Sequence, residues 1–215
     1  MTAWVLCEES GIWSQALWEH GYEVVQVDLA ERNMVKLGHC RQVAPGWSYL
    51  RADVRTLVPG REPWGRPNVV CAFPPCTDLA GVGARLWPAK AGRGQVLDSL
   101  SLLTHCAALA AWAGVAGLVE NPSGLAARVL GEPSMRCNPW EFADEVSDLC
   151  LKRTLLWLYD WPLVLRFTGS ERKPISFIEG VAPGDDQARI RSLAWSGMAR
   201  AFVSSLPKGG NQWQR

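Results

Sequence analysis

A cysteine follows two prolines at the end of one apolar stretch of the chain. Cys76 comes directly after Pro74 and Pro75. Because proline fixes φ and lacks an amide donor, this pair favours a stiff, non-helical loop that presents the cysteine. A thiolate in such a loop can attack an electron-poor carbon. Cys76 can also be a small buried hydrophobic residue, which is the commoner place for a cysteine after a strand.

Acidic side chains end other apolar stretches. Glu120 ends one of them and precedes Asn121 and Pro122. A carboxylate at the edge of a dry pocket can hold or donate a proton, although Glu120 can equally cap a helix or form an ion pair. Asp28 and Asp53 end two earlier stretches. They can accept hydrogen bonds from a ribose and an adenine, as in dinucleotide-binding folds, or they can be ordinary turn residues.

Strand-like and helix-like stretches alternate in the first half of the chain. Short apolar runs predict strands, and apolar residues at helical spacing predict helices. The expected strands are residues 4–7, 23–27, 49–54, 68–73 and 115–119, with further candidates at 140–142 and 154–158. The expected helices are residues 12–20 and 95–113. This alternation predicts an α/β fold whose mostly parallel sheet carries helices on both faces.

The polar residues described above share one position in this expected fold. All of them lie at the carboxyl ends of strands, where open α/β sheets bind ligands. Residues 8–11, after the first expected strand, join the same edge. The sequence therefore predicts one site that is built from several strand ends.

Length and composition favour one domain over residues 1–215. No run approaches the ~20 apolar residues of a membrane span, and the first residues lack the features of a signal peptide. We therefore expect a cytoplasmic protein with no membrane partner. The chain has seven cysteines without a Cys-x-x-Cys pair and three scattered histidines, a pattern that favours neither a metal site nor a disulfide framework.

The C-terminal part of the chain is basic. Residues 151–215 hold ten Lys and Arg against five Asp and Glu, although the whole chain has a formal net charge of +1. Such an excess suits a phosphate-bearing partner, because Lys and Arg neutralise phosphates and release counterions. A solvated basic surface is the alternative interpretation.

Several motifs together resemble the DNA cytosine-5 methyltransferase family, and in particular its short phage and prophage members. The two most specific are Pro74-Pro75-Cys76 and Glu120-Asn121-Pro122, which occur in that order at successive strand ends. Further similar stretches are residues 6–11, 83–87, 138–142, 152–158 and 189–202. The resemblance covers nearly the whole chain. It implies a Rossmann-like S-adenosylmethionine-dependent methyltransferase fold.

This resemblance also implies roles for individual residues. Cys76 would attack carbon 6 of cytosine, Glu120 would hydrogen-bond the ring, and Arg153 would add electrostatic stabilisation. The methyl donor, S-adenosylmethionine or a modified form of it, would be bound by Cys7, Glu8, Glu9, Ser10, Gly11, Asp28, Asp53, Phe73, Pro74, Ser196 and Gly197. The DNA or cytosine nucleotide would contact Pro75, Thr77, Arg85, Asn121, Pro122 and Lys152.

Departures from the family pattern bear on the substrate. The Gly-rich cofactor loop is reduced to residues 9–11, and the Gln-x-Arg-x-Arg element is represented only by residues 152–154. About residues 161–186 would form a minimal target-recognition insert, which is short for reading a groove. This implies relaxed specificity, a single-stranded or nucleotide substrate, or a protein partner that recognises the target. A duplex would require base flipping, with residues 81–94 as a mobile loop closing over the base.

Three functions are compatible with the sequence. The first is methyl transfer to carbon 5 of cytosine in DNA. The second keeps the cysteine chemistry but transfers a larger group from a modified S-adenosylmethionine, or acts on free cytosine nucleotides. The third is a non-catalytic nucleic-acid-binding protein that retains the methyltransferase fold.

Overall fold

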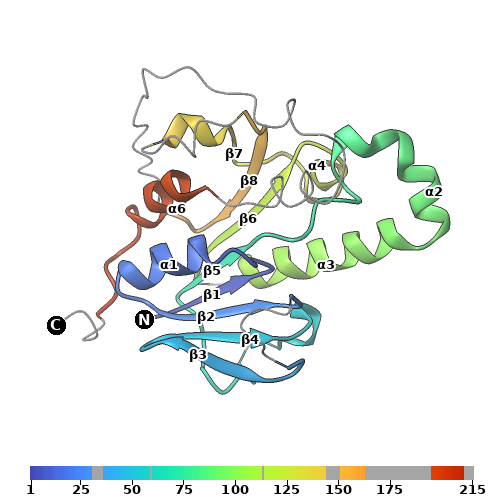
Figure 1. The fold of residues 1–215 in the computed structure, drawn as a ribbon. Coiled ribbons are helices and arrows are strands. Elements are labelled where there is room, and N and C mark those ends of the chain that lie inside the picture. Colours follow the sequence, from blue (N-terminus) through green and yellow to red (C-terminus); the bar gives the residue numbers. More distant parts are fainter. Residues whose placement is uncertain (31–35, 59, 113, 144–150, 163–194, 211–215) are drawn as a thin grey trace.

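One mixed sheet of eight strands forms the centre of the computed structural model (Figure 1). The structure describes residues 1–30, 36–58, 60–112, 114–143, 151–162 and 195–210. In chain order the strands are β1 (Thr2–Leu6), β2 (Glu23–Asp28), β3 (Cys40–Ala44), β4 (Trp47–Arg51), β5 (Val69–Ala72), β6 (Ala116–Pro122), β7 (Met135–Cys137) and β8 (Thr154–Tyr159). Their order across the sheet is β3-β4-β2-β1-β5-β6-β8-β7.

Most of the sheet is parallel. Strands β4, β2, β1, β5 and β6 run in the same direction, whereas β3 at one edge and β8 near the other pair in antiparallel fashion. From β1 the chain moves outward to β2 and β4, and from β5 it moves the opposite way to β6. The order of the strands therefore reverses between β1 and β5. Outside such a reversal, at the carboxyl ends of the strands, open α/β sheets bind ligands.

Helices cover both faces of the sheet. Helices α1 (Ile12–Glu19) and α6 (Ser196–Val203) lie on one face, and α3 (Gln95–Ala110) lies on the other (Figure 1). Alternate strand residues point to opposite faces. Val5 and Cys71 accordingly belong to the core cluster under α1 and α6, and Leu6 and Ala72 belong to the cluster under α3. The predicted α/β fold with helices on both faces of a mostly parallel sheet is confirmed.

The chain segments that follow α1 and α6 are joined by hydrogen bonds. The amide of Gly209 donates to the carbonyl of His20 at 3.1 Å, and the hydroxyl of Tyr22 donates to the carbonyl of Pro207 at 2.8 Å. Because Tyr22 directly precedes β2, this junction lies at the amino ends of the parallel strands. The first residues of both helices therefore point toward the carboxyl ends.

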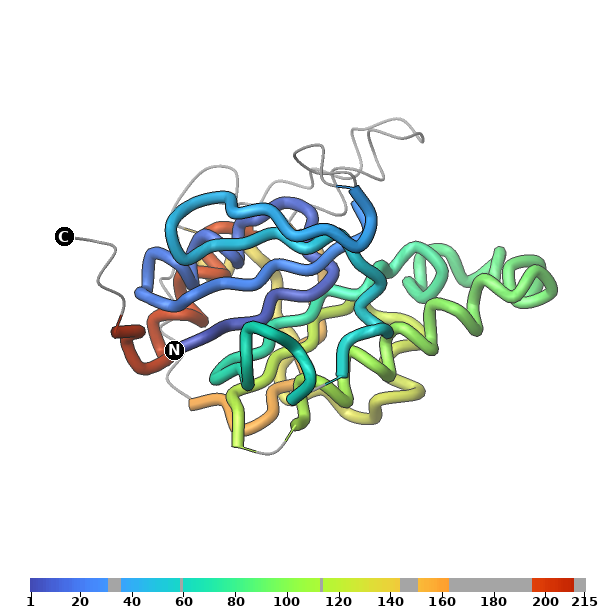
Figure 2. The backbone as a smooth tube through the Cα atoms, turned by 90° about the horizontal axis from the view of Figure 1, so that it is seen from below, coloured from blue at the N-terminus to red at the C-terminus, as the bar shows by residue number. Residues whose placement is uncertain are grey.

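Two expected elements differ in kind from the prediction. Residues 140–142, expected as a strand, lie in a 3-10 helix (Pro139–Phe142). Proline suits the first turn of a helix, and the amide of Asn138 donates to the Glu141 carboxylate at 2.9 Å. Residues 81–94, expected as a loop, contain a 3-10 helix (Gly81–Leu86) followed by α2 (Trp87–Gly92). Figures 1 and 2 show α2 and the start of α3 projecting from the body of the molecule.

Other predictions differ only in their boundaries. The strand expected at residues 49–54 covers Trp47–Arg51, and Val54–Thr56 form a short 3-10 helix that Asp53 caps. The expected insert at residues 161–186 lies outside the described residues, apart from Trp161 and Pro162. Among the helices that the structure describes, none combines the length and apolarity needed to cross a bilayer.

Candidate functional site

Cys76 and Glu120 lie at the carboxyl edge of two neighbouring strands. In the parallel pair formed by β5 and β6, Ala72 lies opposite Val119. Glu120 is the next residue of β6, and Cys76 follows the end of β5 by four residues. The thiol group is half-buried and takes part in no disulfide bond. The structure therefore brings the two predicted catalytic residues to one end of the sheet.

A tight turn fixes the backbone around Cys76. Its carbonyl accepts hydrogen bonds from the amides of Leu79 and Ala80, at 3.0 and 2.8 Å. Before the turn, the Pro74 carbonyl accepts a hydrogen bond from the Asn121 side-chain amide at 2.9 Å. Asn121 is completely buried. This predicted substrate residue therefore holds the Cys76 loop against the end of β6.

The loop after β6 approaches the Cys76 turn very closely. The amide of Gly81 donates to the carbonyl of Ser123 at 2.7 Å, and the amide of Leu125 donates to the carbonyl of Leu79 at 2.9 Å. A Cβ atom at Gly124 would overlap the Leu79 carbonyl. Glycine is therefore required at this position if the two loops are to remain in contact.

Glu120 forms an ion pair with Lys152. Lys152 Nζ lies 3.5 Å from Glu120 Oε1, and both side chains are only 13% exposed. The antiparallel pairing of β6 with β8 places Lys152 there, because Pro122 lies opposite Thr154. The pairing explains why Lys152, predicted as a substrate contact, lies beside the predicted catalytic carboxylate.

A surface hollow of about 560 Å³ lies next to the Cys76 turn and next to the ion pair of Glu120. It is lined by Ala80, Val82, Pro122, Ser123, Asn138, Leu151, Lys152 and Arg153. The hollow borders the Cys76 turn through Ala80 and borders Glu120 through Lys152. Arg153 is exposed and forms no ion pair with any residue that the structure describes. A hollow of this size with one available cation suits a ligand as large as a nucleotide.

Glu8, a predicted cofactor residue, is buried and holds the start of α1. Its carboxylate accepts hydrogen bonds from the hydroxyl of Ser10, from the amide of Ile12 at 3.1 Å and from the hydroxyl of Ser14 at 3.2 Å. Burial raises the pKa of Glu8, and these hydrogen bonds oppose the rise. Gly11 follows with φ of 78°, a left-handed conformation that glycine adopts without strain. Glu8 therefore organises the first loop.

Three more predicted cofactor residues, Cys7, Glu9 and Asp28, lie at the ends of β1 and β2. Cys7 has a left-handed backbone with φ of 56°. A contact with Cys106 and burial raise the pKa of the Cys7 thiol well above its ordinary value. Asp28 is half-buried and accepts the amide of Ala30 at 2.8 Å. Glu9 is exposed at the same edge.

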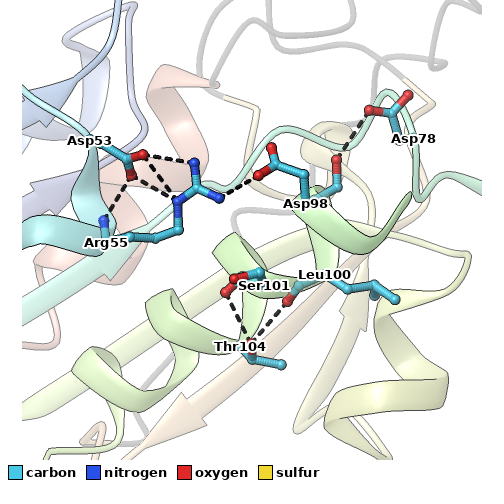
Figure 3. Close-up of polar contacts among 8 residues, drawn as sticks. Asp53, Arg55, Asp78, Asp98, Leu100, Ser101 and Thr104 are labelled. Carbon is cyan, nitrogen blue, oxygen red and sulfur yellow. Dashed lines mark hydrogen bonds and ion pairs between the residues drawn. The ribbon is translucent and has the colours of Figure 1, made fainter. Parts of the chain in front are cut away.

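Asp53 is engaged by a neighbouring arginine. Its carboxylate accepts hydrogen bonds from Arg55 at 2.7–3.1 Å, and Arg55 Nη1 lies 2.5 Å from Asp98 on α3 (Figure 3). Hydrogen bonding to Arg55 lowers the pKa of Asp53. The predicted adenine contact thus forms part of a polar bridge between the end of β4 and α3.

The remaining predicted residues differ in burial and in the contacts they make. The half-buried ring of Phe73 lies 5.0 Å from that of Trp13 on α1. Ser196 accepts a hydrogen bond from Arg200 at 3.2 Å, and Gly197 is buried at the start of α6. Of the other substrate residues, Pro75, Thr77 and Arg85 are exposed, and Pro122 is half-buried.

Sequence reasoning missed several residues of this region. Ser123, Asn138 and Leu151 line the hollow, and Lys90 pairs with Asp78 beside Cys76. Asn138 lies in one of the stretches on which the resemblance rests, so a signal for it was present. The pairing of Lys90 with Asp78 joins positions twelve residues apart, and no local pattern indicates it. Within the described ranges, no three His, Cys, Asp or Glu residues gather as metal ligands would.

The chain matches no protein-family model, and no curated protein is significantly similar to it.

Proposed function

We propose that this protein transfers a methyl or related group to carbon 5 of cytosine in DNA, through a covalent adduct with Cys76. One observation carries the proposal: Cys76 and Glu120 both lie at the carboxyl edge of the neighbouring strands β5 and β6, near a hollow of about 560 Å³ that Arg153 lines. A nucleophile, a carboxylate and a cation next to a space for a nucleotide are the groups that this chemistry requires.

The topology supports a Rossmann-like methyltransferase fold. Counted along the chain, the parallel strands have the spatial order 3-2-1-4-5. This is the order in which the strands of nucleotide-binding Rossmann sheets begin. The reversal between β1 and β5 lies between the loop of residues 7–11 and the loop that leads to Cys76. A cofactor bound there would lie next to the nucleophile.

The residues at this reversal fit S-adenosylmethionine in part. Asp28 offers a half-buried carboxylate to a ribose, Phe73 offers an aromatic wall, and Ser196 and Gly197 begin a helix that points to the same edge. Glu8 is engaged by the protein itself, and so is Asp53. These two residues would shape the cofactor site without direct contact. S-adenosylmethionine, when bound, supplies an activated methyl group to carbon 5.

The residues of the chain perform the remaining chemistry. The Cys76 thiolate forms a bond to carbon 6, and the electron pair of the C5–C6 double bond shifts toward carbon 5 and N3. Glu120 accepts a hydrogen bond from the exocyclic amine and, when protonated, donates one to N3 as negative charge develops there, and Lys152 lies beside its carboxyl group. After transfer, a base removes the proton from carbon 5. The double bond re-forms, and Cys76 leaves as a thiolate.

A free cytosine nucleotide is a second candidate substrate. The hollow favours it, because its volume suits one nucleotide and Arg153 can pair with one phosphate. A nucleotide would reach Cys76 without the base flipping that duplex DNA demands.

Mass spectrometry of nucleosides tests the proposal. DNA would be taken from cells that express the wild-type chain, Cys76→Ala or the control Cys40→Ala, which changes an exposed cysteine on β3. We expect a mass shift on deoxycytidine with the wild type and the control, and none with Cys76→Ala. A shift that persists in Cys76→Ala would refute the mechanism. A shift confined to the nucleotide pool would favour the second candidate.

A further inference from the structure

The turn that carries Cys76 is held from two sides by contacts of different kinds. On the β6 side, its main-chain groups bond to main-chain groups of residues 123–125. Those contacts join main-chain groups, and the lack of a side chain at Gly124 permits them. On the opposite side, the contacts come from side chains of the α2–α3 hairpin and can be removed by substitution.

Lys90 of α2 bridges the two residues that follow Cys76. Its Nζ donates to the Thr77 carbonyl at 2.9 Å and pairs with Asp78 Oδ1 at 2.7 Å. The Ser99 hydroxyl on α3 donates to Asp78 Oδ2 at 3.1 Å. Figure 3 shows the Asp78 carboxylate reaching toward the first turns of α3. Both carboxylate oxygens are therefore engaged, each by a different helix.

This ion pair is shielded although α2 itself is not packed into the core. The side chains of Lys90 and Asp78 are 15% and 21% exposed. Solvent and salt screen such a pair less than they screen a surface pair. Helix α2 buries none of its residues, so the Lys90 contacts attach it to the turn. A stability role in the core is thus a poor explanation for the pair.

We infer that Asp78 and Lys90 are positioning residues, which fix the direction of the Cys76 thiol without touching the substrate. The inference rests on the proposed function. Thr77 and Asp78 directly follow Cys76, and the Cys76 carbonyl closes the turn. A shift of the turn therefore moves the thiol. Covalent attack needs aligned atoms about 3–3.5 Å apart, and a misplacement of about 1 Å can cost up to 10²-fold in rate.

Steady-state kinetics on DNA give the first test. Asp78→Asn and Lys90→Met should each lower kcat about tenfold and change KM little, because the thiol is misplaced while the binding surface remains. Lys90→Arg keeps a cation and should recover most of kcat. The double variant should lose little more than Lys90→Met alone, because that change already removes the ion pair with Asp78. Glu132→Gln, which breaks an exposed ion pair with Arg136, is the matched control.

Thiol reactivity gives a test that does not depend on transferase activity. Cys76 would be alkylated with a neutral reagent, and the modified residue would be identified by peptide mass spectrometry. Asp78→Asn and Lys90→Met should change its rate at least about threefold, because access and thiolate fraction both depend on the turn. Glu132→Gln should leave the rate unchanged. If the wild type transfers no group to DNA, the proposed function fails and this rate still decides the inference.

Two results would overturn the inference. One is an unchanged kcat and an unchanged Cys76 alkylation rate in both variants. The other is a loss of kcat that accompanies a lowered Tm and that Lys90→Arg fails to recover, which would indicate a structural role only.

Discussion

The carboxyl edge of the sheet has two halves, the loops after β1 and β4 and the loops after β5 and β6. Their polar side chains make different kinds of contact. After β1 and β4, the carboxylates of Glu8 and Asp53 accept hydrogen bonds from their own chain. After β5 and β6, main-chain hydrogen bonds hold the loops, and a hollow lies beside them that Ala80 of the Cys76 turn and the exposed Arg153, just before β8, both line. Two acidic side chains of the first half thus shape its loops, whereas in the second half main-chain contacts shape the loops.

A position at a strand end therefore does not by itself define a ligand contact. A carboxylate whose oxygens are already engaged has less capacity to bind a ribose or an adenine. If the proposed function holds, Glu8 and Asp53 support the cofactor loops, and Asp28, which also accepts the amide of Ala30, is the carboxylate that we propose for the ribose. Substitutions in the two halves should separate these roles.

The largest effect is expected at the nucleophile. Cys76→Ala should lower methyl transfer to DNA by about 10³-fold or more, because no other group can form the adduct. Its Tm should stay close to that of the wild type, since the side chain is half-buried and small. Transfer of labelled methyl groups to DNA measures the effect. Activity above a tenth of the wild-type value would mean that the β5 loop is not catalytic.

The next largest effect is expected at the carboxylate. Glu120→Gln should lower kcat by about 10²–10⁴-fold, the usual range for a lost acid–base group. It should also destabilise the fold by about 3 kcal/mol, because the mostly buried Lys152 ammonium loses the negative charge of Glu120. The double variant Glu120→Gln/Lys152→Met should regain stability but not activity. Recovery of both would show that the pair serves the fold alone.

A smaller effect should separate the acidic residues of the other half. Asp28→Asn should weaken S-adenosylmethionine binding about tenfold, as expected for a lost hydrogen bond to a charged group. Asp53→Asn should weaken it by no more than about twofold, and should cost up to about 1 kcal/mol of stability because the ion pair with Arg55 is partly exposed. Calorimetric titration measures both affinities. A larger loss of affinity in Asp53→Asn than in Asp28→Asn would mean that Asp53 contacts the cofactor.

The smallest effect is a change in the pH dependence of stability at Glu8. Burial raises the pKa of Glu8 in the folded protein above its unfolded value of about 4.3. The folded state then binds more protons than the unfolded state, so this residue's contribution to stability falls as pH rises from about 4.3 through the raised folded-state pKa. Glu8→Gln should remove that fall, and denaturant unfolding across this pH window measures it. An identical pH slope in both proteins would contradict the structural role of Glu8.

Local patterns in the sequence predicted the parallel half of the fold well. Residues 23–27 and 12–20 have the periods of a strand and a helix, and both elements formed nearly as expected. Cys76 and Glu120 were correctly placed at neighbouring strand ends, because this follows from the alternation of strands and helices. These features depend on residues close together in the chain.

The features that the sequence did not predict depend on distant pairings. β6 continues through Glu120 to Pro122 because β8 pairs with it from the other side, and the same pairing brings Lys152 to Glu120. The hydrogen bonds of Asp53 form because the Arg55 side chain folds back onto its carboxylate. The spacing of apolar residues in the sequence does not predict such a contact. The 3-10 helix at Pro139–Phe142 formed where aromatic residues suggested a strand, because the proline and its cap favoured a helical turn.

Trapping of the covalent adduct tests the central claim most directly. A DNA substrate with 5-fluorocytosine cannot lose a proton from carbon 5, so Cys76 should remain bonded to carbon 6 after transfer. We predict that intact mass spectrometry will show the wild-type protein with one oligonucleotide attached when S-adenosylmethionine is present, and Cys76→Ala without it. An adduct on Cys76→Ala, or none on a folded wild-type protein that binds the substrate, would contradict the account.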